Sequence, residues 1–479
     1  MSQTTDAGIA TEAPAASLPR AGLILVLLSL AQFMVILDVT VVNVALPAIG
    51  QSLHLGREAL TWVITAYVTT FGGLLILGGR LADALGRKTA FLAGVGVFTL
   101  SSLVAGLATG GPMLLAGRVA QGVGAALLSP AALAVVTTEF TGRDRTRALG
   151  VWAAIGGVGA ALGVVVGGLL TSGPGWEWAF FVNVPVGILV AATLPRLLPA
   201  RPRSGAVRLD IPGAVLGVAT VALLIFGVVR AGATGFGSAA ALVPIGLAVV
   251  AGIFFVLVER RSEVPLVPLG LLTGGALPGA VAVMMAATGV LYAAFFLSSI
   301  FLQDVRQFSA LKTGLILLPI AVAIVGGAHL GGGHIGKFGP HRVAAGGLAI
   351  TAVGVLGMAW VGPTSSVLLS VGIGFFVAAF GIGATFVTAI GSGVATVDER
   401  NAGVASGILN TGHEFGGALG VALVSAVAGG ALTGTGPVAA GFDHAYLVLG
   451  AIGLLGAIVA ALVLPRDLPA TGDGRRFLH

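Results

Sequence analysis

Apolar runs of about 20 residues recur along the whole chain, and this feature restricts it to a membrane-spanning helical fold. Charged residues make up 9% of the 479 residues and hydrophobic residues 57%, and the mean hydropathy is +1.06. An ordinary soluble domain carries about 25% charged residues. Water would not solvate so much apolar surface, whereas an apolar helix of about 20 residues spans a bilayer. We therefore expect an all-α membrane protein.

The apolar runs predict fourteen transmembrane helices, which places both termini on one side of the membrane. The expected helices cover residues 21–46, 59–77, 89–108, 112–137, 148–171, 179–198, 211–229, 239–258, 278–302, 313–333, 343–361, 366–392, 402–431 and 444–464. The first run continues past Asp38 to Pro47 without a convincing cleavage site, so we interpret it as a helix and not as a signal peptide.

The distribution of cations predicts the orientation. With the N-terminus inside, nineteen of the 24 Lys and Arg residues fall in cytoplasmic segments, and Arg118 lies within a helix. The outside segments hold only Arg57, Arg230, Arg306 and Lys312. Because cytoplasmic loops carry the excess of Lys and Arg, we expect a multi-pass protein of the cytoplasmic (inner) membrane with both termini in the cytoplasm.

Glycine patterns recur at an offset of 253 residues and indicate an internal duplication. Gly79 and Gly86 recur as Gly332 and Gly339, and the pattern Gly159, Gly163, Gly167 recurs as Gly412, Gly416, Gly420. We expect two homologous six-helix bundles at 21–198 and 278–464, joined by a linker at 199–277 that carries two inserted helices. Residues 1–20 are expected to form a disordered cytoplasmic tail, and residues 465–479 a second tail.

Four segments of the chain form recognisable motifs, namely residues 37–47 (LDVTVVNVALP), 79–88 (GRLADALGRK), 117–125 (GRVAQGVGA) and 176–185, which runs from Trp176 to Pro185. Together they resemble the major facilitator superfamily, specifically its fourteen-helix drug:proton antiporter branch. The glycines of 148–171 also resemble the branch's antiporter motif, although Val164 stands where that motif usually has proline. The resemblance implies two pseudo-symmetric bundles, alternating access, and proton-driven export of hydrophobic, often cationic drugs.

Asp38 and Arg118 are the first candidates for proton coupling. Each lies roughly 9–12 Å from the outer end of its predicted helix, so the two charges can meet at similar depth. A buried carboxylate in a membrane helix must be paired, protonated or near water. Gln121 lies one helical turn from Arg118 and shares its face. The alternative is a permanent ion pair that only holds the first half together.

Glu414 is the second protonatable carboxylate near the middle of the membrane. It lies with His413 in the predicted helix 402–431, where the repeat places Ala160 and Ala161 in the first half. Such a carboxylate can bind a proton or offset the charge of a cationic substrate. Alternatively, it is hydrogen-bonded to neighbouring helices and serves the fold alone.

Aromatic side chains are candidates for an apolar substrate-binding site, because the faces of their rings attract cationic substrates. The predicted substrate-binding set is Phe33, Trp62, Tyr67, Phe295, Phe296, Phe376 and Phe380, together with Asp38, Gln121 and Glu414. Lipid-facing aromatic residues are the commoner alternative.

Two glycine-containing segments predict conformational functions. In the expected cytoplasmic loop 79–88, the resemblance implies a conformational latch made by Gly79, Asp83, Gly86, Arg87 and Lys88. An ordinary positive-inside loop is the alternative. The second segment is a glycine face of one predicted helix, suited to close helix packing, made by Gly156, Gly159, Gly163 and Gly167.

The sequence contains no nucleotide-binding loop, because none of its three lysines follows a phosphate-binding glycine pattern. We therefore expect export driven by the proton gradient, with no cofactor and no metal. The expected partners are protons, membrane lipid and a small hydrophobic substrate, with no nucleic acid, and the protein is expected to be a monomer. An exporter of a metabolite or amino acid on the same fold is the close alternative. A membrane-embedded enzyme is disfavoured, because neither a metal-ligand spacing nor a nucleophile motif occurs. A channel is also disfavoured, because it has no need for duplicated halves with buried carboxylates.

Overall fold

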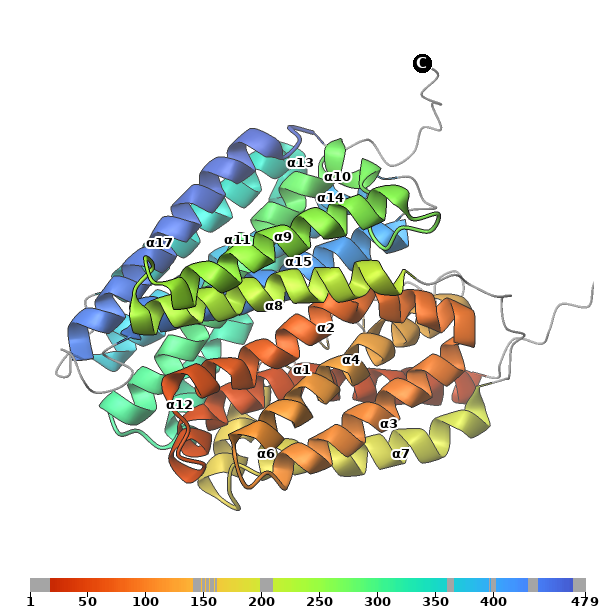
Figure 1. The fold of residues 1–479 in the computed structure, drawn as a ribbon, viewed down its shortest axis with the longest axis horizontal. Coiled ribbons are helices and arrows are strands. Elements are labelled where there is room, and N and C mark those ends of the chain that lie inside the picture. The colour runs from red at the N-terminus through yellow and green to blue at the C-terminus, as the bar shows by residue number, and fades with distance from the viewer. Residues whose placement is uncertain are drawn as a thin grey trace, which may run out of the picture.

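The computed structural model describes residues 18–140, 148, 151, 155, 159, 162–198, 210–359, 366–395, 397, 402–429 and 438–467. These residues contain helices, turns and bends but no β-strand. The long helices lie side by side and extend along the molecule (Figure 1). The predicted all-α fold is therefore confirmed. The tail expected at 1–20 falls largely outside the described residues, and the first helix already begins at Leu18.

The described residues form a series of helices along the chain. The first half contains α1 (Leu18–Ser52), α2 (Arg57–Leu85), α3 (Arg87–Gly106), α4 (Gly111–Glu139), the helical segment Leu162–Ser172, α6 (Trp178–Phe181) and α7 (Asn183–Leu197). Next come α8 (Ile211–Thr234), α9 (Ala239–Arg261) and the short α10 (Gly270–Thr273). The second half contains α11 (Leu277–Ile300), η1 (Phe301–Val305), α12 (Ala310–Leu317), α13 (Pro319–Gly357), η2 (Leu368–Ile373), α14 (Gly374–Ala395), α15 (Ala402–Val427) and α17 (Val438–Val463).

The described residues hold eleven helices that are long and apolar enough to cross a membrane. One of these runs, Ala310–Gly357, contains two of the predicted helices, because Gly339 at φ 77° breaks the helix within it. The segment Leu162–Ser172 and α15 occupy two further predicted positions. The structure is thus consistent with fourteen spans. Many outward apolar side chains, such as Leu247 and Ile253 on α9, are exposed, as a lipid-facing surface requires.

Gly86 and Gly339, which are 253 residues apart, each separate two helical segments and adopt positive φ angles of 89° and 77°. Residues that carry a side chain rarely adopt this backbone conformation, so glycine is needed at both positions. The prediction of a loop from Gly79 onward is wrong, because α2 continues to Leu85 and only Gly86 turns the chain. Gly79 therefore relieves no backbone strain; it lies in the helix near Pro130 of α4.

The glycine patterns of the two halves make equivalent helix contacts. A Cβ on Gly167 would lie 2.9 Å from the Cα of Val41 in α1, and a Cβ on its counterpart Gly420 would lie 2.6 Å from the Cα of Gly289 in α11. Gly416 also faces α11, where an added Cβ would lie 2.5 Å from the Cα of Met285. Gly163 meets Thr40 of α1 in the same way, and Gly159 approaches Ile36 of that helix. Small residues thus allow close packing on α1 and α11. Gly156 lies outside the described residues.

The two halves meet mainly along α2 and α15. We call the end of the molecule that holds the α1–α2 connection the Leu55 end, and the opposite end, with the α2–α3 connection, the Gly86 end. At the Leu55 end the hydroxyl groups of Thr61 and Ser425 lie 2.6 Å apart, and the Ser299 hydroxyl donates to the Asn43 carbonyl at 2.9 Å. Polar contacts therefore hold the halves together at this end.

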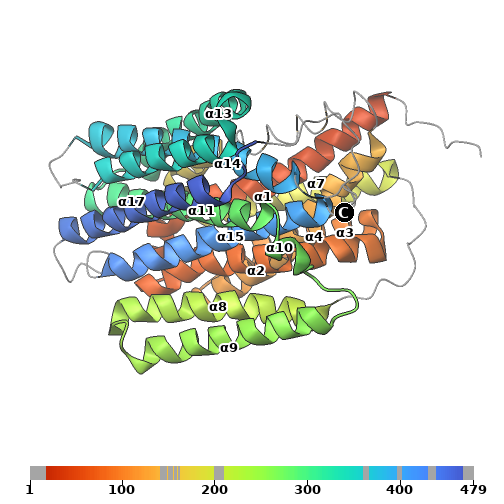
Figure 2. The ribbon, with the colours of Figure 1, turned by 90° about the horizontal axis from the view of Figure 1, so that it is seen from above.

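The inserted helices α8 and α9 form a hairpin on one side of the molecule. They pack against each other, and α8 also contacts α2 and α15. In Figure 2 this hairpin lies along the edge of the molecule, next to α2. The hairpin thus covers the junction between the halves on that side.

Candidate functional site

Asp38 lies in the middle of α1 and has no exposed surface. Its carboxylate accepts hydrogen bonds from three side chains of the first half. The donors are Arg118 Nη1 of α4 at 2.5 Å, Gln121 Nε2 of α4 at 2.9 Å and Asn183 Nδ2 of α7 at 3.0 Å. Gln121 also donates to Ser102 of α3 at 2.8 Å. The carboxylate is therefore both ion-paired and hydrogen-bonded, which offsets the cost of burying it.

Arg118 connects this network to α2. It is 1% exposed, and its Nε donates to the Val63 carbonyl at 2.8 Å. Its guanidinium lies 4.3 Å from the centre of the Tyr67 ring and 5.9 Å from that of Phe180. Such a position over a ring face attracts the cation. A change in the charge of Asp38 would therefore act on α2 through Arg118.

The structure thus brings Asp38, Arg118 and Gln121 together, as their depth and spacing suggest. Asn183 and Ser102 are further members of the network that were not predicted from the sequence. Asn183 is a buried amide at the start of α7, within the segment that carries the family resemblance. Asn183 could have been recognised from the sequence, because an amide in such an apolar region needs a hydrogen-bond partner when it is buried. Ser102 gives no comparable signal, since serine is common in membrane helices.

Glu414 lies on α15 at the contact between the two halves and is 8% exposed. It packs against Gly72 of α2, where an added Cβ would lie 2.5 Å from the Glu414 Cβ. His413 Nδ1 lies 3.1 Å from its Oε1, and Oε2 has no hydrogen-bond partner among the described residues. The His413 ring is flanked by Tyr292 and Phe386, with ring centres 5.7 and 5.6 Å away. A carboxylate oxygen thus remains available beside an aromatic cluster.

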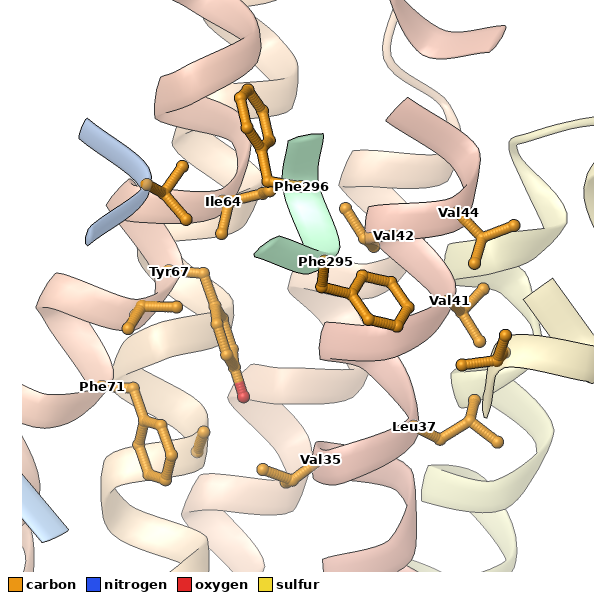
Figure 3. Packing of buried hydrophobic residues seen from close by; sticks show 14 of the residues in the cluster. Val35, Leu37, Val41, Val42, Val44, Ile64, Tyr67, Phe71, Phe295 and Phe296 are labelled. Carbon is orange, nitrogen blue, oxygen red and sulfur yellow. The ribbon is translucent and has the colours of Figure 1, made fainter. Parts of the chain in front are cut away.

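The predicted aromatic set divides into two groups. Tyr67 of α2 and Phe295 and Phe296 of α11 belong to one large buried cluster, which also includes Val42 of α1 (Figure 3). The Tyr67 hydroxyl has no hydrogen-bond partner among the described residues. Figure 3 shows Tyr67, Phe295 and the α1 residue Val42 within this cluster.

The other aromatic residues lie in different surroundings. Phe33 is half-buried on α1 near Gly159, and Trp62 on α2 lies 6.4 Å from the Phe226 ring of the inserted hairpin. Phe380 packs against α13, whereas Phe376 is 39% exposed. Phe33, Trp62 and Phe380 are nevertheless partly buried side chains that pack against the buried cluster. Phe376 is not part of it, because α14 directs this side chain outward.

The basic residues after Gly79 bind backbone carbonyl groups at the Gly86 end. Arg87 donates to the Ala134 carbonyl of α4 at 3.1 Å. Lys88 donates to the carbonyls of Pro195 and Leu198 at the end of α7, both at 2.7 Å. Lys88 thus lies at the C-terminal end of α7, where carbonyls lack helical partners, and its charge stabilises that end. The Asp83 side chain lies outside the described part of the chain.

Comparison with known proteins identifies the family. The profile of the Major Facilitator Superfamily matches residues 28–421. The chain belongs to this superfamily. It is a multi-pass membrane transporter and not an enzyme, and the resemblance drawn from the four motifs is confirmed.

Several relatives within the superfamily are antibiotic resistance or export proteins. The chain is 37% identical to the puromycin resistance protein of Streptomyces alboniger over 437 residues, covering 88% of this chain and 86% of the relative. It is also 37% identical to the cephamycin export protein of Amycolatopsis lactamdurans, covering 94% of each chain. A multidrug resistance protein of Mycobacterium tuberculosis is 33% identical and matches 86% of this chain.

A solved structure supports the fold. A bacterial homologue of the human lysosomal transporter Spinster, in an inward-facing and unoccupied conformation, superposes with a TM-score of 0.62. The match covers 94% of this chain and 96% of that protein, at 20% identity. At this identity the likeness describes the fold alone. No group of metal-ligating side chains occurs in the described residues.

Proposed function

We propose that this superfamily member is a proton-coupled antiporter that exports hydrophobic, often cationic drugs or antibiotics across the cytoplasmic membrane. It works as a monomer with both termini in the cytoplasm, and it needs no cofactor because the proton gradient supplies the energy. Each charge that crosses the membrane carries about 2.3 kcal/mol per 100 mV. Relatives that are named for resistance to puromycin or for export of cephamycin support this class of cargo.

The observation that carries the proposal is the position of Glu414. It is a buried carboxylate at the contact between the halves, it has one oxygen without a partner among the described residues, and it lies beside the rings around His413. A proton or a cationic substrate would satisfy this oxygen, but not both at once. Competition of this kind couples entry of one to exit of the other. The flanking rings would add attraction for a cation.

The Asp38 network is proposed as the second proton site. To accept a proton, Asp38 must loosen its contact with Arg118, whose guanidinium also binds the Val63 carbonyl and stacks on Tyr67 of α2. Protonation would therefore release a constraint on α2. Because α2 contacts α15, the release would favour separation of the halves at the Leu55 end and alternating access.

The test uses purified protein in liposomes with an imposed pH gradient and a fluorescent cationic dye. We expect Glu414→Gln to abolish uphill dye transport while leaving the protein folded. Glu58→Gln is the matched control, because Glu58 is a partly exposed carboxylate that faces Arg230 at 3.5 Å. Equal pH-driven transport by Glu414→Gln and by the parent protein would contradict the proposal.

A second experiment separates the drug exporter from a metabolite exporter on the same fold. The same liposomes are tested with several chemically unrelated dyes and antibiotics, and with amino acids. Transport of several of the drugs supports our proposal. Transport of a single metabolite alone would support the alternative.

A further inference from the structure

Two buried carboxylates lie together at the Gly86 end, away from Asp38 and Glu414. Asp210 directly precedes α8 and is 6% exposed, and Glu259 lies in the last turn of α9 and is 3% exposed. Both belong to the inserted hairpin, and neither has a place in the proposed transport chemistry.

The two carboxyl groups share the space above Gly213. A Cβ on this glycine would lie 2.6 Å from Glu259 Oε1, 2.8 Å from Asp210 Cγ and 2.9 Å from Asp210 Oδ1. A side chain at position 213 would therefore separate the acids, and glycine lets them approach each other. The two ends of the hairpin meet at this point.

Each acid has one satisfied oxygen and one without a partner. Asp210 Oδ1 accepts from the Gly213 amide at 2.7 Å and so caps α8, and Glu259 Oε2 accepts from the Val267 amide at 3.0 Å. Asp210 Oδ2 and Glu259 Oε1 are buried without a hydrogen-bond partner among the described residues. A buried polar atom without a partner carries a substantial free-energy cost. A proton bound by one acid and donated toward the other removes part of that cost.

Arg80 of α2 is the cation that faces the pair. It donates to the Val264 carbonyl at 2.8 Å and to the Pro265 carbonyl, so it holds the connection after α9 and is not ion-paired with Glu259. Asp210 and Arg80 are the charged groups that act on Glu259 from neighbouring elements. Arg260, Arg261 and Glu263 follow it in sequence and are exposed.

We propose that Asp210 and Glu259 bind one proton between them, and that this shared proton fastens the inserted hairpin to the Gly86 end of α2. While the proton is bound, the pair carries a single negative charge and Arg80 holds the carbonyls of residues 264 and 265. When the proton leaves to water, two adjacent buried carboxylates repel each other and attract Arg80. Arg80 then releases the connection, and the segment around Leu266 opens.

The experiment uses the absence of cysteine from the chain. Leu266→Cys places a thiol at a position that is 3% exposed, and Gly270→Cys places one in open space. We measure the reaction of each with a polar maleimide from about pH 5 to pH 8, a range above the usual carboxyl pKa values. The ratio of the two rates cancels the ionisation of the thiol itself.

We expect the ratio to rise with pH, by up to about tenfold per pH unit, because opening is linked to release of one proton. Glu259→Gln should abolish the rise, since the amide supplies a permanent donor. Glu263→Gln, the matched control at a nearby exposed acid, should retain it. A flat ratio in the parent protein, or an unchanged rise in Glu259→Gln, overturns the proposal.

Asp210→Asn provides an independent variant, because asparagine preserves the helix cap. It should also remove the rise with pH. In addition, infrared spectra of the parent protein near neutral pH should contain a protonated carboxyl band that this variant loses. If the band is unchanged in Asp210→Asn and in Glu259→Gln, the shared proton does not exist.

Discussion

The buried pair of Asp38 and Arg118 makes a quantitative prediction. Asp38→Asn keeps the shape of the side chain but removes the charge that compensates Arg118, which is 1% exposed. An uncompensated buried charge typically costs about 3–5 kcal/mol. We expect this loss in the free energy of unfolding for Asp38→Asn, and a similar loss for Arg118→Gln. The double variant has no buried charge, so its loss should fall below the sum of the single losses by about 2–3 kcal/mol.

The assay is unfolding in mixed detergent micelles with increasing sodium dodecyl sulfate, followed by tryptophan fluorescence. The pair Arg230 and Glu58 is the control, because its atoms lie 3.5 Å apart and its side chains are 41% and 38% exposed. Single and double variants at this exposed pair should give an interaction free energy of no more than about 1 kcal/mol. If the losses at Asp38 and Arg118 simply add, the carboxylate does not compensate the arginine and the reasoning is refuted.

Other variants test the packing and the contacts between the halves. Gly416→Leu should destabilise the protein by about 1–3 kcal/mol through overpacking against α11, whereas Gly391→Leu, which enters open space, should have little effect on the detergent melting temperature. Cysteines in place of Thr61 and Ser425, whose hydroxyl groups lie 2.6 Å apart, should form a disulfide that stops transport until a reductant is added. Lys88→Met should lower the free energy of unfolding by about 1–2 kcal/mol, because the end of α7 loses two charged hydrogen bonds.

The sequence predicted the helices well, because apolar runs in a membrane protein have one physical solution. It also predicted the equivalence of Gly86 and Gly339, since a positive φ angle demands glycine at both positions. It misplaced the loop at Gly79, because a glycine within a membrane helix is compatible with the helix. Sequence alone does not distinguish a glycine that packs from one that turns the chain.

The candidate site was only partly predictable. Asp38 and Arg118 stand out as charges in apolar helices, and their depths allow them to meet. The roles of Asn183 and Ser102 depend on which faces of α3 and α7 turn toward α1, and this follows from the packing of distant helices. Exposure separates Phe376 from Phe295 for the same reason, since the two aromatic runs look alike in sequence.

One face of α2 contacts the buried Asp38 network and another face contacts the opposite half of the protein. Substitutions on α2 should therefore be poorly tolerated. Val63 and Tyr67 hold Arg118, while Thr61 and Gly72 contact α15. Damage to the Asp38 network should therefore be repaired most readily by changes along this shared helix and its partner. In a genetic selection for restored resistance, second-site revertants of an Asp38 variant should cluster on these two helices and leave the lipid-facing surface unchanged.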